Sequence, residues 1–179
     1  FTLNDLLRLA LMASENRAAS ALARSYPGGK AALVAAMNAK ANELGMLDTR
    51  FIDPAGLSRG NVSTAQDLVK MVAAARDYDL IRQYTTSASH SVDGSGGREL
   101  RFTNTNPLVR SVSWDIGLSK TGYISEAGLC LVMEANVNQR PVIIVLLNSW
   151  GKRTRVGDAN RIKRWMESGY ARGRSTRQG

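Results

Sequence analysis

The chain has 179 residues, of which 44% are hydrophobic and 22% charged. This composition is typical of one globular domain or two closely joined subdomains, rather than of a disordered chain. No apolar run approaches the roughly 20 residues needed to cross a bilayer, so we expect no transmembrane segment. The net charge of +9 favours anionic partners. Because Lys and Arg are scattered and only three Phe are present for stacking, we expect no nucleic acid partner; an anionic polymer and plain surface solvation both stay open.

Helical periodicity fills the first half of the sequence. The chain begins inside an apolar stripe without an initiator Met, so we interpret residue 1 as a processing or cloning boundary. Thr2 with Asp5 resembles a capping box and predicts a helix start. A second short helix is expected at about residues 17–25, and Gly45 suits the C-terminal cap of a third.

The Thr and Asp spacing recurs at Thr64 and Asp67, which predicts a further helix start. Before it, residues 51–57 are rich in turn formers and are expected to be a loop. After it, residues 87–97 turn to Ser and Gly and lose their periodicity. We interpret them as a surface loop or a joint between subdomains.

The second half of the sequence changes from helical to alternating periodicity. Apolar residues alternate from 112 to 118, and two more strands are expected at residues 128–137 and 140–147, before a final amphipathic helix. Residues 142–147 are all apolar, so both faces of that strand should be covered and it should lie centrally in its sheet. Because the sequence supplies too few neighbours for a central strand, we expect the missing part of the sheet to precede residue 1. The fold class predicted is α/β, of the α+β type.

Two residue types with reactive side chains occur once each. Cys130 cannot form an internal disulfide, and its place between two leucines predicts a buried, inert thiol rather than a nucleophile. His90 has no Cys or His nearby at ligand spacing, so a zinc site is not expected. We therefore expect no metal and no cofactor.

Two short motifs carry the chemical signal. Ser14-Glu15-Asn16 follows the first apolar stripe, and Lys120-Thr121-Gly122 ends the first strand of the second half. Either motif alone arises by chance in many proteins, but this order, with S-x-N after a helix and K-T-G on a strand, is much more specific. The pair resembles the signature of penicillin-binding proteins and class A β-lactamases.

Further segments resemble the low-molecular-mass penicillin-binding proteins, which are serine D-Ala-D-Ala peptidases. These segments are residues 37–41, 44–46, 49–51, 54–57 and 63–65, while residues 14–19 and 26–29 are similar to the D-alanyl-D-alanine endopeptidase branch. The resemblance implies a helical subdomain packed on an antiparallel sheet flanked by helices. It places S-x-N in a helical part, residues 1–90, and K-T-G with the final helix in residues 91–179. Both would belong to one transpeptidase-like catalytic domain whose N-terminal segment is absent.

The resemblance also implies an activity. It is that of a periplasmic serine endopeptidase or carboxypeptidase which hydrolyses D-Ala-containing peptide stems of peptidoglycan through an acyl-enzyme and is inhibited by β-lactams. The attacking serine and its lysine, on the family's S-x-x-K segment, would precede residue 1. Two alternatives stay open: a carboxypeptidase in place of an endopeptidase, and a catalytically silent wall-binding fragment.

The resemblance gives roles to the S-x-N residues. Ser14 would relay a proton to the leaving nitrogen, because amide hydrolysis by serine needs a proton path to the leaving amine. Asn16 would hydrogen-bond the substrate amide or orient the missing lysine. The alternative for Asn16 is a loop residue that bonds its own backbone.

The K-T-G segment would bind substrate. Lys120 would supply positive charge beside the nucleophile and the substrate carboxylate, and by parity it should share the face of residues 112–118. Thr121 belongs to the same substrate-binding segment, Gly122 would let the substrate backbone approach, and the Tyr123 amide would be an oxyanion donor. A substrate peptide could then pair along this edge strand. The alternative for Lys120 is a strand-end lysine that reaches water.

Two other candidates are rejected at this stage. Residues 149–152 match S-x-x-K, but they leave a strand after K-T-G, where the chemistry needs a helix start. Glu43 is the nearest match to the deacylating Glu of class A β-lactamases, yet it is expected mid-helix. A class A β-lactamase is therefore disfavoured.

Overall fold

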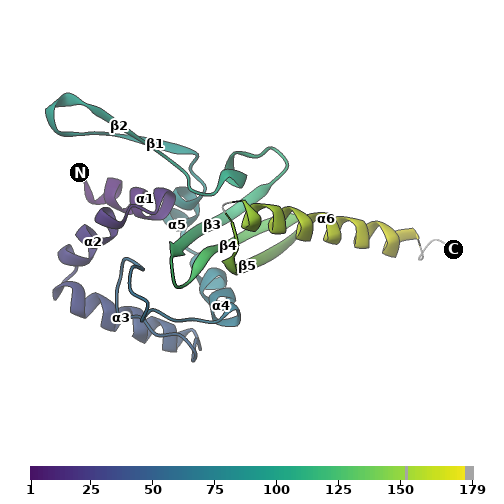
Figure 1. The fold of residues 1–179 in the computed structure, drawn as a ribbon, viewed down its shortest axis with the longest axis horizontal. Helices are drawn as coiled ribbons and strands as arrows, with labels where there is room; N and C mark the ends of the chain where they lie inside the picture. Colours follow the sequence, from purple (N-terminus) through teal and green to yellow (C-terminus); the bar gives the residue numbers. More distant parts are fainter. Residues whose placement is uncertain (152, 176–179) are drawn as a thin grey trace.

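The computed structural model describes residues 1–151 and 153–175, and the side chains of 95 and 170–175 are not included in that description. Helices precede a hairpin and a three-stranded sheet, and a long helix follows (Figure 1). The elements are α1 (Leu3–Ala13), α2 (Asn16–Ser25), α3 (Gly29–Glu43), α4 (Ala65–Ala75), α5 (Asp79–Thr85), β1 (Ser89–Asp93), β2 (Glu99–Thr103), β3 (Asp115–Ile124), β4 (Gly128–Val137), β5 (Arg140–Ser149) and α6 (Thr154–Ser175). Short 3-10 turns, Ser95–Gly97 and Pro107–Arg110, lie in the connections. In this part of the chain no helix is both long and apolar enough to span a bilayer.

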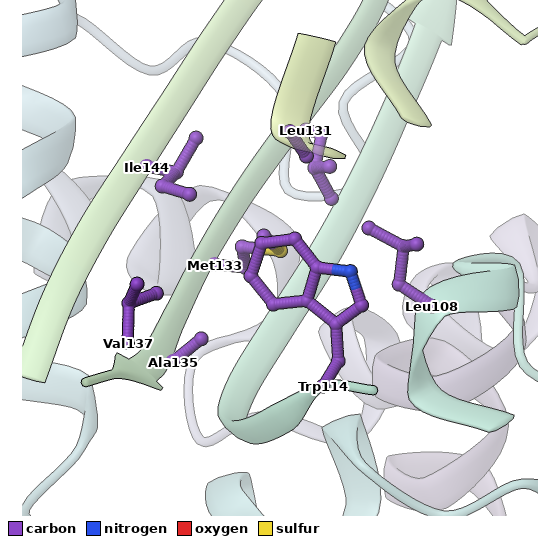
Figure 2. Packing of buried hydrophobic residues seen from close by; sticks show 8 residues of the cluster. Leu108, Trp114, Leu131, Met133, Ala135, Val137 and Ile144 are labelled. Atoms are coloured by element: carbon purple, nitrogen blue, oxygen red, sulfur yellow. The ribbon is translucent and has the colours of Figure 1, made fainter. Parts of the chain in front are cut away.

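Helices cover both faces of the antiparallel sheet, whose strand order is β3-β4-β5. On one face, Leu131, Met133 and Ile144 pack with Ala159 of α6. Figure 2 shows the Trp114 indole among these side chains. On the other face, apolar residues of all three strands pack with α4 and α5. The predicted α+β class is confirmed, since the fold mixes helices with an antiparallel sheet.

Within the described residues β5 lies at an edge of the sheet, which agrees with the expectation that this sequence supplies too few neighbours for it; its central place in a larger sheet stays a prediction. The middle strand is β4, and β5 has β4 as its one neighbour among them. Ile144 is buried, while Val142, Ile143, Val145 and Leu146 are half-buried. The apolar run records that helices cover both faces of the strand; it does not record how many strands flank it.

The expected parity of residues 112–118 is also wrong, because β3 contains an irregularity. Its register against β4 shifts between Ile116 and Leu118. Trp114 and Ile116 therefore pack on the α6 side, whereas Leu118 packs on the α4 side. Lys120 shares the face of Leu118 and not that of Trp114. Val112 precedes the strand and is fully exposed.

The local helix signals are confirmed. Thr2 forms a capping box with Asp5 at the start of α1, and the Thr64 side chain caps α4. Gly45 follows the C-cap of α3 with a φ of 68°, the left-handed conformation that glycine tolerates.

The interpretation of residues 87–97 as loop is wrong in part, since they include β1. The Ser and Gly residues form the tip of the β1–β2 hairpin, and Val92, Leu100 and Phe102 pack against α1. His90 pairs with Asp5 of α1, with 3.1 Å between Nε2 and Oδ1. Helix α5 also escaped the sequence analysis.

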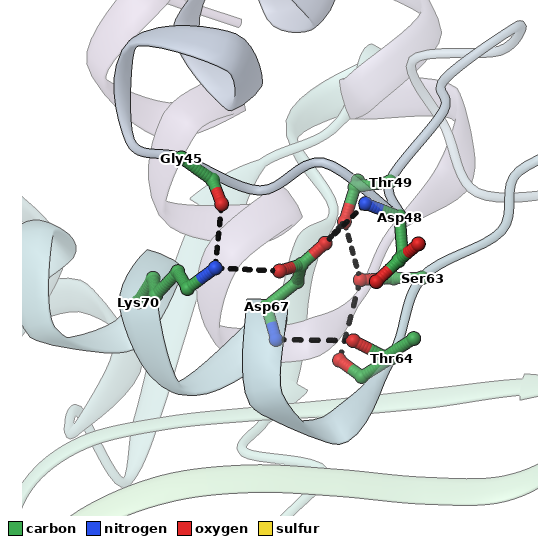
Figure 3. Close-up of polar contacts among 7 residues, drawn as sticks. All are labelled: Gly45, Asp48, Thr49, Ser63, Thr64, Asp67 and Lys70. Carbon is green, nitrogen blue, oxygen red and sulfur yellow. Dashed lines mark hydrogen bonds and ion pairs between the residues drawn. The ribbon is translucent and has the colours of Figure 1, made fainter.

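A buried carboxylate joins α4 to the loop after α3 (Figure 3). Asp67 accepts hydrogen bonds from the Asp48 amide and the Thr49 hydroxyl, both at 2.9 Å. It also forms an ion pair with Lys70, with 3.0 Å between Oδ1 and Nζ. Burial alone would raise the pKa of Asp67, but the contacts with Lys70, Thr49 and Asp48 hold it below its ordinary value. This network fixes α4 against the loop that follows α3.

We expect Asp67→Ala to lower the melting temperature more than Asp67→Asn, because alanine leaves the Asp48 amide and the Thr49 hydroxyl without their acceptor at this buried position. The control is Asp79→Ala, since the Asp79 side chain is 89% exposed. The stabilisation by Asp67 should be complete above the ordinary pKa of 3.8 and be lost as the pH falls through the lower folded value. Thermal melts at several pH values measure both effects. Equal melting temperatures for Asp67→Ala and Asp79→Ala would contradict this assignment.

Candidate active site

The turn between α1 and α2 presents Ser14 to the sheet. Helix α1 ends at Ala13, and Ser14 adopts a left-handed conformation with a φ of 53°. Glu15 caps the next helix by accepting from the Arg17 amide at 3.0 Å. A non-glycine residue in this conformation is strained by about 1 kcal/mol or more. The strain falls on the residue that the sequence marks as a site candidate.

The fold brings the S-x-N and K-T-G motifs into direct contact. The Lys120 ammonium donates to the Ser14 hydroxyl and, at 2.9 Å, to the Thr121 carbonyl. Ser14 Oγ also lies 3.4 Å from both the carbonyl and the hydroxyl oxygen of Thr121. Asn16, the first residue of α2, is exposed at the cleft. Among the described residues its side chain forms no hydrogen bond, which disfavours the alternative of a loop Asn bonded to its own backbone.

The charge of Lys120 is weakened by its surroundings. Burial, followed by repulsion from Arg155, lowers the pKa of Lys120 from 10.5 to about 8. Arg155 on α6 donates to the Cys130 carbonyl at 3.1 Å and to the Gly122 carbonyl at 3.4 Å. Burial lowers the pKa of Arg155 as well. The alternative of a strand-end lysine that reaches water is therefore disfavoured, and Arg155, a second cation that the sequence analysis missed, lies beside Lys120.

A cleft of about 730 Å³ opens over these groups. Its walls include Ser14, Asn16, Arg155, the segment 120–123 and the loop 53–57. Gly122 and Tyr123 are exposed, and the outer edge of β3 has no strand partner within the described residues. A Cβ on Gly122 would lie 3.7 Å from the nearest heavy atom, an ordinary contact. Packing against Cys130 therefore does not require glycine at this position. The absence of a side chain at Gly122 instead leaves space on the cleft side of β3.

Cys130 is not the buried thiol that the sequence predicts. It is half-exposed and lines the cleft, across β3–β4 from Gly122. Its sulfur contacts the carbonyls of Ala127 and Gly128 at 3.5 and 3.8 Å. Alternation along β4 predicts which face of the sheet Cys130 lies on. It does not predict that this third residue of the strand lies at the cleft, where the face is not fully covered.

The rejected candidates lie away from the cleft. Ser149 ends β5 and pairs with Leu129, while residue 152 of that S-x-x-K match is outside the described residues. Glu43 is the last residue of α3 rather than a mid-helix residue, and it pairs with Lys40 at 2.7 Å. Across residues 1–151 and 153–175, no group of His, Cys, Asp and Glu side chains is arranged to hold a metal.

Ser14 of S-x-N lies on the turn between α1 and α2 and accepts a hydrogen bond from Lys120 of K-T-G. These two motifs in contact at one site define the class of penicillin-binding proteins and β-lactamases. Residues 1–151 match the peptidase S11 family, described as D-alanyl-D-alanine carboxypeptidase. The chain belongs to this family.

Relatives and solved structures agree with the family assignment. The chain is 51% identical over 166 residues to a D-alanyl-D-alanine endopeptidase of Pseudomonas aeruginosa, covering 92% of this chain and 54% of that protein. It superposes on the Streptomyces K15 DD-transpeptidase with a TM-score of 0.83 at 31% identity, covering 95% of this chain and 68% of that one. For penicillin-binding protein D2 of Listeria monocytogenes, in its cefotaxime-bound form, the TM-score is 0.78 at 27% identity, with 95% and 67% covered. The chain thus spans about half the length of the Pseudomonas relative.

Proposed function

We propose that the protein containing this chain is a serine D-Ala-D-Ala peptidase that hydrolyses peptide cross-links of peptidoglycan through an acyl-enzyme. The observation that carries the proposal is the contact between Ser14 of S-x-N and Lys120 of K-T-G at the floor of an open cleft. The similarity to a D-alanyl-D-alanine endopeptidase supports endopeptidase over carboxypeptidase activity. A periplasmic location and inhibition by β-lactams belong to the same proposal, the latter supported by the cefotaxime-bound relative.

The attacking serine, in this proposal, lies outside residues 1–179. Ser14 is fixed by Lys120 and lies near Thr121, as a relay needs, and no S-x-x-K sequence other than residues 149–152 occurs in the chain. We assign residues 1–90 and 91–179 to two parts of one catalytic domain, which an N-terminal segment completes. Residue 90 lies inside β1, so the two parts are joined through the β1–β2 hairpin.

Ser14 would pass a proton to the leaving amine of the substrate. Its oxygen accepts from Lys120, so its own hydrogen is free to point to the Thr121 carbonyl or into the cleft. The unbonded Asn16 amide is available to the substrate amide. Together these groups satisfy the proton path that amide hydrolysis by serine requires.

Lys120 and Arg155 would form a cationic edge for the substrate carboxylate. The Arg155 guanidinium is held by the carbonyls of Gly122 and Cys130, next to the strand along which a substrate peptide would pair. The exposed Gly122 and the Tyr123 amide would then face the scissile carbonyl. The role of the Tyr123 amide as an oxyanion donor is part of the proposal, as is the close approach of the substrate backbone at Gly122.

The test is acylation by penicillin, followed by intact-protein mass spectrometry. The polypeptide 1–179 should stay unmodified, because it holds the relay and the cationic edge but not the attacking serine. The intact gene product should gain one penicilloyl group and should cleave a D-Ala cross-linked muropeptide. An adduct on Ser14 or Ser149 of the 1–179 polypeptide would overturn the assignment of the nucleophile.

The alternatives give other results in the same experiment. A silent wall-binding protein would bind peptidoglycan, but the intact gene product would form no penicilloyl adduct. A carboxypeptidase would form the adduct and release terminal D-Ala from a pentapeptide, while leaving cross-linked muropeptide intact.

A further inference from the structure

A third hydroxyl adjoins the Ser14 and Thr121 pair. Thr105, in the loop between β2 and the 3-10 turn Pro107–Arg110, lines the same cleft. Its Oγ1 lies 2.6 Å from Thr121 Oγ1 and 3.5 Å from the Met12 carbonyl. Its amide donates to the same Met12 carbonyl at 3.3 Å. Thr105 therefore touches both the K-T-G motif and the last turn of α1, which carries Ser14.

The loop holds Thr105 with two buried asparagines. Asn104 is 5% exposed and donates to the carbonyls of Thr85 and Ser87 at 2.8 and 2.9 Å. Asn106 is 1% exposed and donates to the Ser119 hydroxyl at 2.8 Å. Because buried amides are costly unless bonded, this clamp fixes the backbone on both sides of Thr105. Thr105, which lies between the two asparagines, is thereby held in position beside Thr121.

We propose that Thr105 is a positioning residue for the Ser14 proton relay, acting through the Thr121 hydroxyl. This inference rests on the proposed peptidase function. Each hydroxyl has one hydrogen and can accept twice. The Thr105 hydrogen has two acceptors in reach, Thr121 Oγ1 at 2.6 Å and the Met12 carbonyl at 3.5 Å, and the shorter contact favours Thr121. The Thr121 hydrogen is then left for Ser14 Oγ, 3.4 Å away. Ser14 then accepts from both Lys120 and Thr121, and its own hydrogen is left to donate to the Thr121 carbonyl or into the cleft.

Without the Thr105 hydroxyl, Thr121 loses its 2.6 Å partner and is free to rotate. Thr121 can then accept the Ser14 hydrogen, which turns the relay proton away from the leaving amine. The loss is one neutral hydrogen bond in an ordered network, so we expect kcat of the intact gene product to fall about fivefold to tenfold in Thr105→Val. The KM for cross-linked muropeptide should change little, because Thr105 is not part of the cationic edge.

The order of variants separates a hydroxyl role from a packing role. Valine keeps the shape of threonine and lacks the hydroxyl, whereas serine keeps the hydroxyl and lacks the methyl. Positioning predicts that Thr105→Ser recovers wild-type kcat and that Thr105→Val does not. Packing predicts the reverse order and would overturn the proposal. Thr103→Val is the control, since Thr103 is exposed at the end of β2.

A double-mutant cycle tests the route through Thr121. If Thr105 acts through Thr121, the double variant Thr105→Val with Thr121→Val should have the same kcat as Thr121→Val alone. Additive losses would overturn the route. The proposed function fails separately, if the wild-type protein does not cleave muropeptide at all. Circular dichroism melts confirm that each variant is folded at the assay temperature.

Discussion

Ser14→Ala is expected to lower kcat of the intact gene product on a D-Ala cross-linked muropeptide by about 10²–10⁴-fold. The substitution removes the hydroxyl that accepts from Lys120 and lies 3.4 Å from Thr121 Oγ1. The nucleophile and the oxyanion donors stay in place, so penicillin binding should persist. Steady-state kinetics with purified muropeptide measures the loss.

A second substitution at the same position separates chemistry from folding. Ser14 has a φ of 53°, and glycine adopts that conformation without steric cost. Ser14→Gly should therefore melt at or above the wild-type temperature and lose as much activity as Ser14→Ala. If Ser14 serves the helix junction alone, Ser14→Gly keeps its turnover, and the relay assignment is wrong. If Ser14→Gly instead loses its turnover and keeps its stability, the strained backbone at Ser14 serves to position the hydroxyl.

The sequence signals that predicted structure correctly are local. Thr2, Thr64 and Gly45 each act within one turn of their own helix, and the structure confirms each. The S-x-N and K-T-G motifs are local too, and the fold places Ser14 of the first against Lys120 of the second. A residue type with one demanding conformation or one fixed contact pattern can be identified without tertiary information.

The predictions that failed depend on relations between elements. The irregularity between Ile116 and Leu118 reverses the parity of β3, and Gly117 at that point is the sequence signal for a bulge that the alternation concealed. The β1–β2 hairpin has only three apolar residues that pack on α1, namely Val92, Leu100 and Phe102, and a Ser- and Gly-rich turn separates them. Three such residues are too few to reveal the alternating pattern of a strand.

The site residues that were missed belong to no short motif. Arg155 reaches the cleft from the first turns of α6, and Thr105 reaches it from a loop held by two buried asparagines. Neither position is distinguishable in sequence from other surface Arg and Thr residues. A signal did exist for the loop, since Asn104 and Asn106 flank Thr105 just before a predicted strand, where such residues are typical caps and turns.

The last prediction concerns the charge of Lys120 and gives opposite signs for activity and stability. Burial and Arg155 lower its pKa to about 8, so the side chain is mostly protonated at pH 7 and loses its charge at a pH where an ordinary lysine keeps it. We expect kcat/KM for a substrate with a free carboxylate to fall above about pH 8. Lys120→Arg should remove this alkaline limb, because arginine stays charged. Lys120→Ala should lower kcat/KM by about 10²–10³-fold near pH 7, as loss of a preorganised electrostatic group does.

Stability should respond in the other direction. Below about pH 8, Lys120 is protonated in both the folded and the unfolded chain, and the depression from 10.5 corresponds to a cost of about 3 kcal/mol in the folded state. Between pH 8 and 10.5 the unfolded chain binds more protons than the folded one, so this cost fades and stability rises with pH. Lys120→Met, neutral and of similar length, should therefore be more stable than wild type at pH 7, with a difference that shrinks toward pH 10. Urea unfolding of both proteins at pH 7, 8.5 and 10 measures it, and a constant difference across this range would show that Lys120 keeps an ordinary pKa and that its charge is not held at a cost in the cleft.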